Sequence, residues 1–185
     1  CRGTEQRVLN RDGSLKAVIA VGVYKSTFDT LYKEAVTWPG ARAGLYLLLA
    51  HPRADHTRVG AMGYCFGGTM ALELGRDGAP VHAIVGFHSG LANATPTDAA
   101  NITGKVLVCL GVDDPIIPPA QRAAFEQEMN AAGVDWQMVL YSGAGHSFTN
   151  KLADGSRPGF QYHEASDLRS WRAMVAHFEE VFATR

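Results

Sequence analysis

The sequence has no uninterrupted apolar run approaching the roughly 20 residues that a membrane-spanning helix needs. It also has no excess of charge of one sign, because 17 Lys and Arg residues stand against 18 Asp and Glu residues. Proteins that bind nucleic acids or anionic membranes usually carry a basic surplus. We therefore expect neither a nucleic acid nor a membrane among the partners of this chain.

Cysteine is scarce, with only three residues and no CxxC pair. An odd, widely spaced set argues against a disulfide framework. Residues 1–16 are polar and lack the apolar centre of a signal peptide. These features predict a reduced, cytoplasmic protein. Because the chain begins with Cys1 instead of Met, we also expect a processed chain or a fragment of a longer one.

The 185 residues, 46% of them hydrophobic, are enough for one globular domain over residues 1–185. Short apolar runs, typical of buried strands, alternate with longer amphipathic segments. The expected strands are residues 17–24, 58–64, 81–87, 105–110 and 135–141. The expected helices are residues 40–51, 66–75, 119–132 and 164–182. This order predicts an α/β fold with a mostly parallel sheet and helices on both faces.

The sequence GYCFGG, residues 63–68, lies between an expected strand and an expected helix. It fits the G-x-C-x-G form of a nucleophile elbow, in which small residues allow a sharp turn that exposes the central side chain. The following helix N-terminus favours a thiolate at Cys65, and the backbone N–H of Phe66 is a natural oxyanion donor. The alternative is a buried structural cysteine beside a glycine-rich helix start.

Carboxylates and a histidine follow in the order that an α/β-hydrolase requires. Asp113 and Asp114 come directly after the expected strand 105–110, and His146 follows the expected strand 135–141. The carboxyl ends of parallel strands share one edge of a sheet, so these side chains should meet Cys65 there. Either aspartate could orient the histidine on this evidence.

The remaining histidines form no HxH or HExxH pattern, so we expect no metal site and no cofactor. Only His88, which follows the expected strand 81–87, falls on the edge of the sheet that carries Cys65. We expect it to line a substrate pocket, with a hydrogen-bonded structural role as the alternative. The others are His51, His56, His82, His163 and His177.

These motifs resemble the dienelactone hydrolase family of α/β-hydrolases. The resemblance covers residues 41–182, including the segments GYCFGG, GVDDPIIP and GAGHSFTN, whereas residues 1–40 match poorly. It implies an α/β-hydrolase-type sheet that lacks the first strands of the family and is N-terminally truncated. It also implies Cys65 as nucleophile, Asp114 rather than Asp113 as acid, and His146 as base. We expect Phe66, Tyr64 and His88 to contribute to the oxyanion hole and to substrate binding.

The resemblance further implies hydrolysis of carboxylic esters or lactones through a thioacyl-enzyme, as in carboxymethylenebutenolidase. Two departures bear on the substrate and the oxyanion hole. Asn150 stands where the family carries a substrate-binding arginine, and no segment matches the His-Glu loop that supplies the second oxyanion donor. We expect a monomer or homodimer acting on a small-molecule ester or lactone.

Other readings of the same motifs lead to different functions. Class I glutamine amidotransferases also have G-x-C-x-G after a strand, but they follow it with His-x-Glu, whereas this chain has His146-Ser147-Phe148. An oxidant sensor with a single elbow cysteine would not need Asp114. A truncated or non-catalytic hydrolase domain that acts as a binding or interaction protein is the principal alternative to an enzyme.

Overall fold

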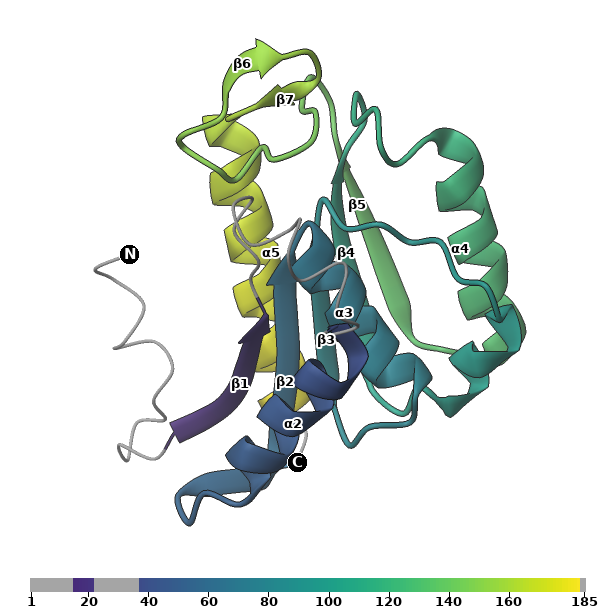
Figure 1. Cartoon of the computed structure of the whole chain (residues 1–185), viewed down its shortest axis with the longest axis vertical. Coiled ribbons are helices and arrows are strands. Elements are labelled where there is room, and N and C mark those ends of the chain that lie inside the picture. The colour runs from purple at the N-terminus through teal and green to yellow at the C-terminus, as the bar shows by residue number, and fades with distance from the viewer. Residues whose placement is uncertain (1–14, 22–36, 184–185) are drawn as a thin grey trace.

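The computed structural model of the chain describes residues 15–21 and 37–183 (Figure 1). Within these residues five strands form one sheet in the order β1-β2-β3-β4-β5, and every neighbouring pair is parallel. The strands are β1 (Leu15–Val21), β2 (Ala54–Tyr64), β3 (Ala83–Phe87), β4 (Lys105–Gly111) and β5 (Trp136–Tyr141). The expected mostly parallel α/β sheet is confirmed, and residues 22–24 of its first expected strand lie outside the described residues.

Helices separate the strands and end close to the predicted boundaries. They are α2 (Thr37–Leu49), α3 (Phe66–Arg76), α4 (Pro119–Ala132) and α5 (Glu164–Ala183). Gly133 ends α4 in a left-handed conformation with φ 69°, which is the backbone that glycine adopts at low cost. Among the described helices, none combines the length and the apolar character needed to cross a bilayer.

The sheet is covered on both faces, as alternation along its strands requires. From β4, Val106, Val108 and Leu110 pack into a core with α2, α3 and α4. Leu107 and Cys109 point to the opposite face and pack in a second core with α5. Figure 1 shows α2 and α3 in front of the sheet and α5 behind it. Cys109, in the middle of β4, is fully buried.

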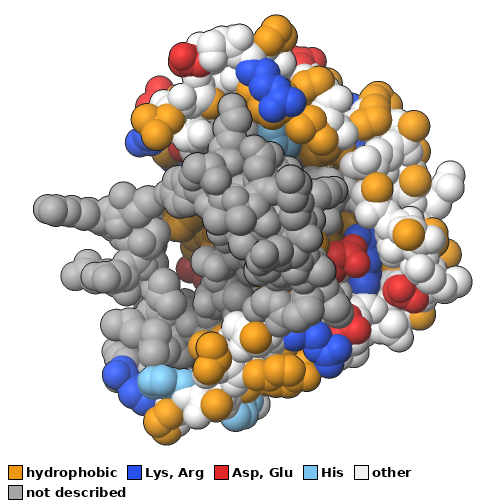
Figure 2. Space-filling model, in the orientation of Figure 1, with side chains coloured by type: hydrophobic (Ala, Val, Ile, Leu, Met, Phe, Trp, Pro, Cys, Tyr) orange, Lys and Arg blue, Asp and Glu red, His pale blue; other side chains and the backbone are white. Residues whose placement is uncertain are grey.

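Helix α2 carries apolar side chains around much of its circumference. Leu45 is buried in the core below the helix, whereas Tyr46 and Leu47 are 57% and 76% exposed. Figure 2 shows hydrophobic side chains gathered over this helix on the visible face of the molecule. Burial against the sheet therefore does not account for the whole apolar run LYLLL, because Tyr46 and Leu47 face away from the core.

A buried ion pair joins α3, the helix that follows Cys65, to α4. Arg76 is 2% exposed and donates from Nε and Nη2 to the two carboxylate oxygens of Glu128, each at 2.8 Å. Its remaining guanidinium nitrogen donates to Glu73 at 2.7 Å. Such two-pronged pairing satisfies the buried charges and holds the planar group in one orientation. The last turn of α3 is thus fixed against α4.

A two-stranded hairpin lies beyond the carboxyl ends of the parallel strands (Figure 1). It consists of β6 (Asp154–Arg157) and β7 (Phe160–Gln161), which pair antiparallel. Neither this hairpin nor the short 3-10 helix η2 (Pro96–Asn101) is predicted by the sequence. Strands of four and two residues are too short for an alternating pattern to emerge.

Candidate active site

Cys65 occupies a sharp turn between β2 and α3. Its backbone has φ 53° and ψ −122°, an uncommon conformation for a residue with a side chain. The Cys65 N–H donates to the carbonyl of Phe87 at 2.9 Å, and its own carbonyl accepts from Gly68 at 3.1 Å. The turn is therefore held by the neighbouring strand β3 and by the first turn of α3, which together offset its strain.

The glycines around Cys65 allow this turn for steric reasons. A Cβ placed on Gly63 would collide with the backbone of Gly67 and Gly68, and one on Gly68 would collide with the side chain of Ser89. Strand and helix thus approach too closely for any larger residue at these positions. Gly63, the first glycine of the G-x-C-x-G motif expected for a nucleophile elbow, is therefore a packing requirement of this structure, as is Gly68, the residue after the motif.

His146 and Asp114 lie on loops at the same edge of the sheet. Asp114 follows β4 and His146 follows β5, and both side chains are nearly inaccessible to solvent. His146 Nδ1 donates to Asp114 Oδ2 at 2.8 Å, while Asp114 Oδ1 accepts from the backbone N–H of Ile116 at 2.8 Å. Asp113 is exposed instead, and its N–H donates to the carbonyl of Ala144. Of the two adjacent aspartates, only Asp114 contacts the imidazole.

The other imidazole nitrogen of His146 reaches the cysteine. Nε2 lies 3.1 Å from Cys65 Sγ, which is within hydrogen-bonding distance of a sulfur acceptor. The structure thus brings Cys65, His146 and Asp114 into one continuous hydrogen-bonded chain, although the residues lie far apart in sequence. Nucleophilic enzymes require this arrangement, in which a base contacts the nucleophile and a third group orients the base.

The electrostatics of the pair favour a thiolate beside an imidazolium. Burial acts to raise the pKa of Cys65, but the hydrogen bond and charge of His146, together with the N–H of Phe66, outweigh it and lower that pKa. Burial alone would lower the pKa of His146, but the bonds to Asp114 and Cys65 raise it to about 9. Each charge therefore stabilises the other, as expected for a reactive cysteine.

His88 lies directly beside this pair, at the end of β3. Its side chain is 3% exposed, its backbone φ is 40°, and its ring centre is 4.9 Å from that of His146. Burial first, and then the charge of His146, lower the pKa of His88 to about 3, so the ring is neutral. Nε2 shares a 2.9 Å hydrogen bond with Thr149 Oγ1, whereas Nδ1 has no partner among the described residues.

Tyr64 and Phe66 flank Cys65 in the sequence and occupy different surroundings. The Tyr64 ring stacks on Phe87 with centres 4.6 Å apart, and lies 6.1 Å from the ring of His88. Burial, followed by the charge of Asp167, raises the pKa of Tyr64 to about 12, so its hydroxyl is neutral at physiological pH. The backbone N–H of Phe66 acts on the Cys65 sulfur and helps to lower the pKa of the thiol.

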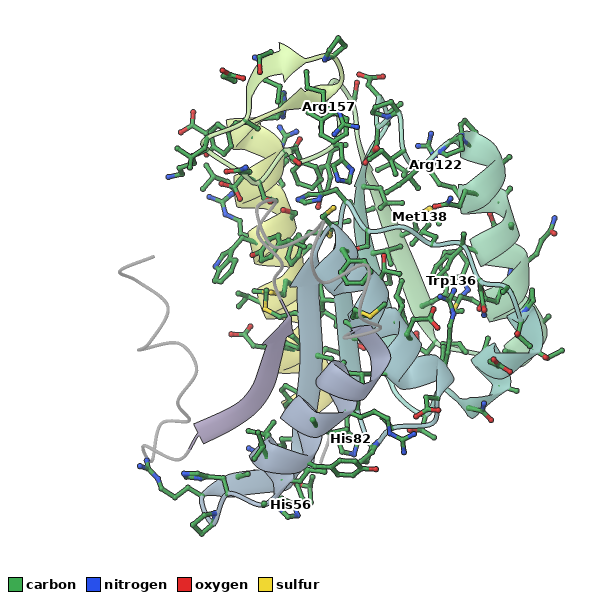
Figure 3. All side chains as sticks on the ribbon, viewed as in Figure 1. His56, His82, Arg122, Trp136, Met138 and Arg157 are labelled. Carbon is green, nitrogen blue, oxygen red and sulfur yellow. The ribbon has the colours of Figure 1, made fainter. Side chains whose placement is uncertain are left out.

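The β6–β7 hairpin adds two residues that sequence reasoning missed. The Phe160 ring lies 4.9 Å from the ring of His146, and the guanidinium of Arg157 lies 3.8 Å above the Phe160 ring. Figure 3 shows Arg157 at the hairpin end of the molecule. The turn-forming residues Pro158 and Gly159 mark a loop in the sequence, but they give no indication that it folds over the histidine.

The other expected positions make contacts outside the hydrogen-bonded chain of Cys65, His146 and Asp114. Asn150 is exposed, and its side chain accepts from the N–H of Leu152 at 3.0 Å, so it stabilises a local turn. His163 bonds to Ser166, and His177 lies near the carbonyl of Lys105. Figure 3 shows His56 and His82 at the opposite end of the sheet from Arg157.

Comparisons with known proteins give a family match over most of the chain. The sequence model described as the dienelactone hydrolase family matches residues 16–182. An uncharacterised protein of Caenorhabditis elegans is 31% identical over 153 residues, which cover 78% of this chain and 94% of that protein. A Bradyrhizobium protein named probable 2-oxo-3-(5-oxofuran-2-ylidene)propanoate lactonase is 31% identical over 125 residues, covering 63% of this chain and 50% of that protein.

Among solved structures, a dienelactone hydrolase-like promiscuous phosphotriesterase from metagenomic libraries is 42% identical and superimposes with a TM-score of 0.77. The alignment covers 84% of this chain and 66% of that one. The chain thus spans half the length of the Bradyrhizobium relative and just under two thirds of this solved structure. Its α/β-hydrolase fold is shared with this solved structure.

Proposed function

The chain belongs to the dienelactone hydrolase family, and on this basis we propose that it hydrolyses carboxylic esters or lactones through a thioacyl-enzyme. One observation carries the proposal: the hydrogen-bonded chain from Asp114 through His146 to Cys65, with contacts of 2.8 and 3.1 Å. In this proposal Cys65 is the nucleophile, His146 the general acid and base, and Asp114 the group that orients His146.

The first half of the reaction forms the thioacyl-enzyme. The Cys65 thiolate attacks the carbonyl carbon, so a C–S bond forms and the carbonyl oxygen takes up the negative charge. The N–H of Phe66 donates to this oxygen, and one such donor is typically worth ~10²–10³ in rate. When the intermediate collapses, the C–O bond breaks and His146 passes its Nε2 proton to the departing alkoxide. A lactone gives the same acyl-enzyme with the alcohol still attached.

The second half releases the acid and restores the pair. His146, now neutral, removes a proton from water as the water oxygen attacks the thioester carbon. The C–S bond breaks, the thiolate leaves, and the imidazolium stabilises it again. Asp114 accepts the Nδ1 proton in a hydrogen bond throughout, which keeps Nε2 directed at the reacting atoms. No metal or cofactor takes part in these steps.

The surroundings of Cys65 favour a compact, partly apolar substrate. Tyr64, His88 and Phe160 present neutral rings around Cys65 and His146, and Asn150 does not offer the positive charge of a carboxylate-binding arginine. The relatives include a named lactonase and a promiscuous phosphotriesterase. We therefore include a lactone and a neutral phosphotriester beside simple esters as substrate candidates. We further propose that the protein acts in the cytoplasm, which keeps a free thiol reduced.

The test is turnover of a short-chain nitrophenyl ester by the purified chain. Cys65→Ala should lower kcat/KM by at least ~10³-fold, because it removes the nucleophile itself. Cys109→Ala is the matched control, since Cys109 is fully buried in the sheet and has no part in the reaction. Folded protein that fails to hydrolyse esters, lactones and phosphotriesters would contradict the proposal and favour the non-catalytic, ligand-binding alternative.

A further inference from the structure

Three side chains of metal-ligating type converge at the carboxyl edge of the sheet. Cys65 Sγ, a ring nitrogen of His146 and a ring nitrogen of His88 all lie within 4.8 Å of one another. They follow three different strands, β2, β5 and β3, so the three residues do not form a short sequence motif. A set of one thiolate and two imidazoles is a donor set that Zn²⁺ and related soft divalent cations prefer.

His88 is the member that the proposed hydrolysis leaves without a defined chemical task. Its side chain is 97% buried, and its Nδ1 has no hydrogen-bond partner among the described residues. Burying a polar atom without a hydrogen-bond partner costs free energy of folding, and such atoms are uncommon in native structures. An imidazole that donates through Nε2 keeps its lone pair on Nδ1, where it can bind a cation.

Outer contacts already orient both imidazoles as metal sites require. His146 donates from Nδ1 to Asp114 Oδ2 at 2.8 Å, which leaves Nε2 for a cation. His88 bonds through Nε2 to Thr149 Oγ1 at 2.9 Å, which leaves Nδ1. Carboxylates and hydroxyls in this position fix the tautomer of ligating histidines, and their removal typically lowers metal affinity ~10–100-fold.

We propose that Cys65, His146 and His88 form a three-ligand site for a thiophilic divalent cation such as Zn²⁺ or Cd²⁺, which reversibly blocks the nucleophile and the base. On binding, sulfur and two nitrogens form bonds to the cation, and the proton shared by Cys65 and His146 leaves to solvent. Tetrahedral zinc bonds of about 2.0–2.3 Å place such ligand atoms roughly 3.5 Å apart, so only small side-chain shifts are needed. The fourth position stays open.

The cation is an inhibitor in this proposal and has no part in hydrolysis. It competes with the acyl group for Cys65 and takes the Nε2 lone pair that His146 needs for proton transfer. The inhibition rests on the proposed function, whereas the binding itself does not. A direct measure of binding therefore separates the two.

The experiment titrates the full chain carrying Cys1→Ser with Cd²⁺ and follows the ultraviolet thiolate-to-cadmium charge-transfer band. The band should saturate at one Cd²⁺ per chain and disappear in Cys65→Ser. His88→Phe keeps a ring against Phe148, which lies 5.3 Å away, but removes both nitrogens, and should weaken Cd²⁺ binding by at least ~10-fold. Thr149→Val, which leaves His88 in place, should weaken it in the same direction. His56→Ala, at the other end of the sheet, is the control and should bind Cd²⁺ unchanged (Figure 3).

The outcomes distinguish the two proposals. A Cd²⁺ band that depends on Cys65 and His88, in a folded protein that turns over no ester, lactone or phosphotriester, would support the metal site and overturn the hydrolase. Ester turnover without any band would overturn the metal site alone. Unchanged affinity in folded His88→Phe and Thr149→Val would also overturn it, because Cys65 and His146 would then bind the cation without His88.

Discussion

The backbone N–H of His146 donates to the carbonyl of Gly159 at 2.7 Å. This bond joins the loop that carries the histidine to the β6–β7 hairpin, and a bridge between His146 and Phe160 extends it. Gly159 also faces the loop of the acid, because a Cβ on it would lie 2.8 Å from Pro115 Cγ. One glycine of the hairpin therefore contacts the loops of both His146 and Asp114.

We expect Gly159→Ala to lower both stability and activity. Gly159 has φ 78°, where an alanine costs about 1–2 kcal/mol, and the added methyl group must displace Pro115 next to Asp114. Gly133→Ala is the matched control, because Gly133 has φ 69° and nothing within 4 Å of the new methyl group. Thermal melts should show a loss in both variants, but kcat/KM should fall only in Gly159→Ala. An equal loss of activity in the two would show that the hairpin does not position the site.

The two adjacent aspartates should respond very differently to amidation. Asp114→Asn preserves the shape of the side chain but weakens its hold on the orientation and the charge of His146. We expect kcat/KM to fall by ~10–10³-fold. This is less than the ~10⁴-fold loss seen in serine triads, because a thiol depends less on its base. Asp113 is exposed and touches no imidazole, so Asp113→Asn should change kcat/KM less than about tenfold. Both are measured on one ester, with folding checked by thermal melts. A larger loss for Asp113→Asn would reverse the assignment of the acid.

Cys65 should be alkylated much faster than Cys109 by iodoacetamide. The pKa of Cys65 is lowered by His146 against the effect of burial, whereas burial raises the pKa of Cys109 to about 12. Only the thiolate reacts, so the ratio should exceed ~10² at neutral pH. Mass spectrometry of the Cys1→Ser chain follows both sites, and the difference should vanish in urea. Equal rates in the folded protein would contradict an activated thiol.

The pH dependence of kcat/KM should reveal the proton on His146. Its pKa of about 9 predicts that hydrolysis of an alkyl ester declines as pH rises through about 9, because a neutral imidazole cannot protonate the departing alkoxide. A nitrophenyl ester, whose leaving group needs no proton, should lack this decline. Asp114→Asn should move the alkyl-ester limb to lower pH, because the bond to Asp114 is the largest influence that raises the pKa. An alkaline limb that is identical for both substrates would contradict the assignment.

The same ionisations set the sign of the effect on stability. The raised pKa of His146 contributes stability that is fully present below its ordinary value of 6.5 and lost as pH rises through about 9. The lowered pKa of Cys65 contributes stability that is lost as pH falls through this lowered pKa of the thiol. Where the two pH ranges overlap, rising pH removes the His146 contribution and adds the Cys65 contribution. The free energy of unfolding measured in urea should therefore show a plateau against pH. His146→Gln should lack the loss contributed by His146, which in the wild type falls between pH 6.5 and about 9.

The sequence by itself determined the order of strands and helices and the elbow at Cys65. Continuous apolar runs predict buried parallel strands because burial on both faces requires them, and Gly63 is demanded by its contact with the start of the adjoining helix. The order of nucleophile, acid and histidine follows from the connections between strands. These features depend on neighbours in the chain, which is why a single sequence reveals them.

Tertiary structure decided the features that depend on segments far apart in the chain. That Asp114 rather than Asp113 faces His146 depends on how the turn after β4 meets the loop after β5, although the family resemblance indicated the same residue. The hairpin over His146 left no periodic signal in the sequence, and the place of His88 after a strand indicated the edge of the sheet but not its closeness to Cys65. They arise because parallel strands bring their carboxyl ends to one edge, where short irregular loops pack against each other through contacts that no local pattern encodes.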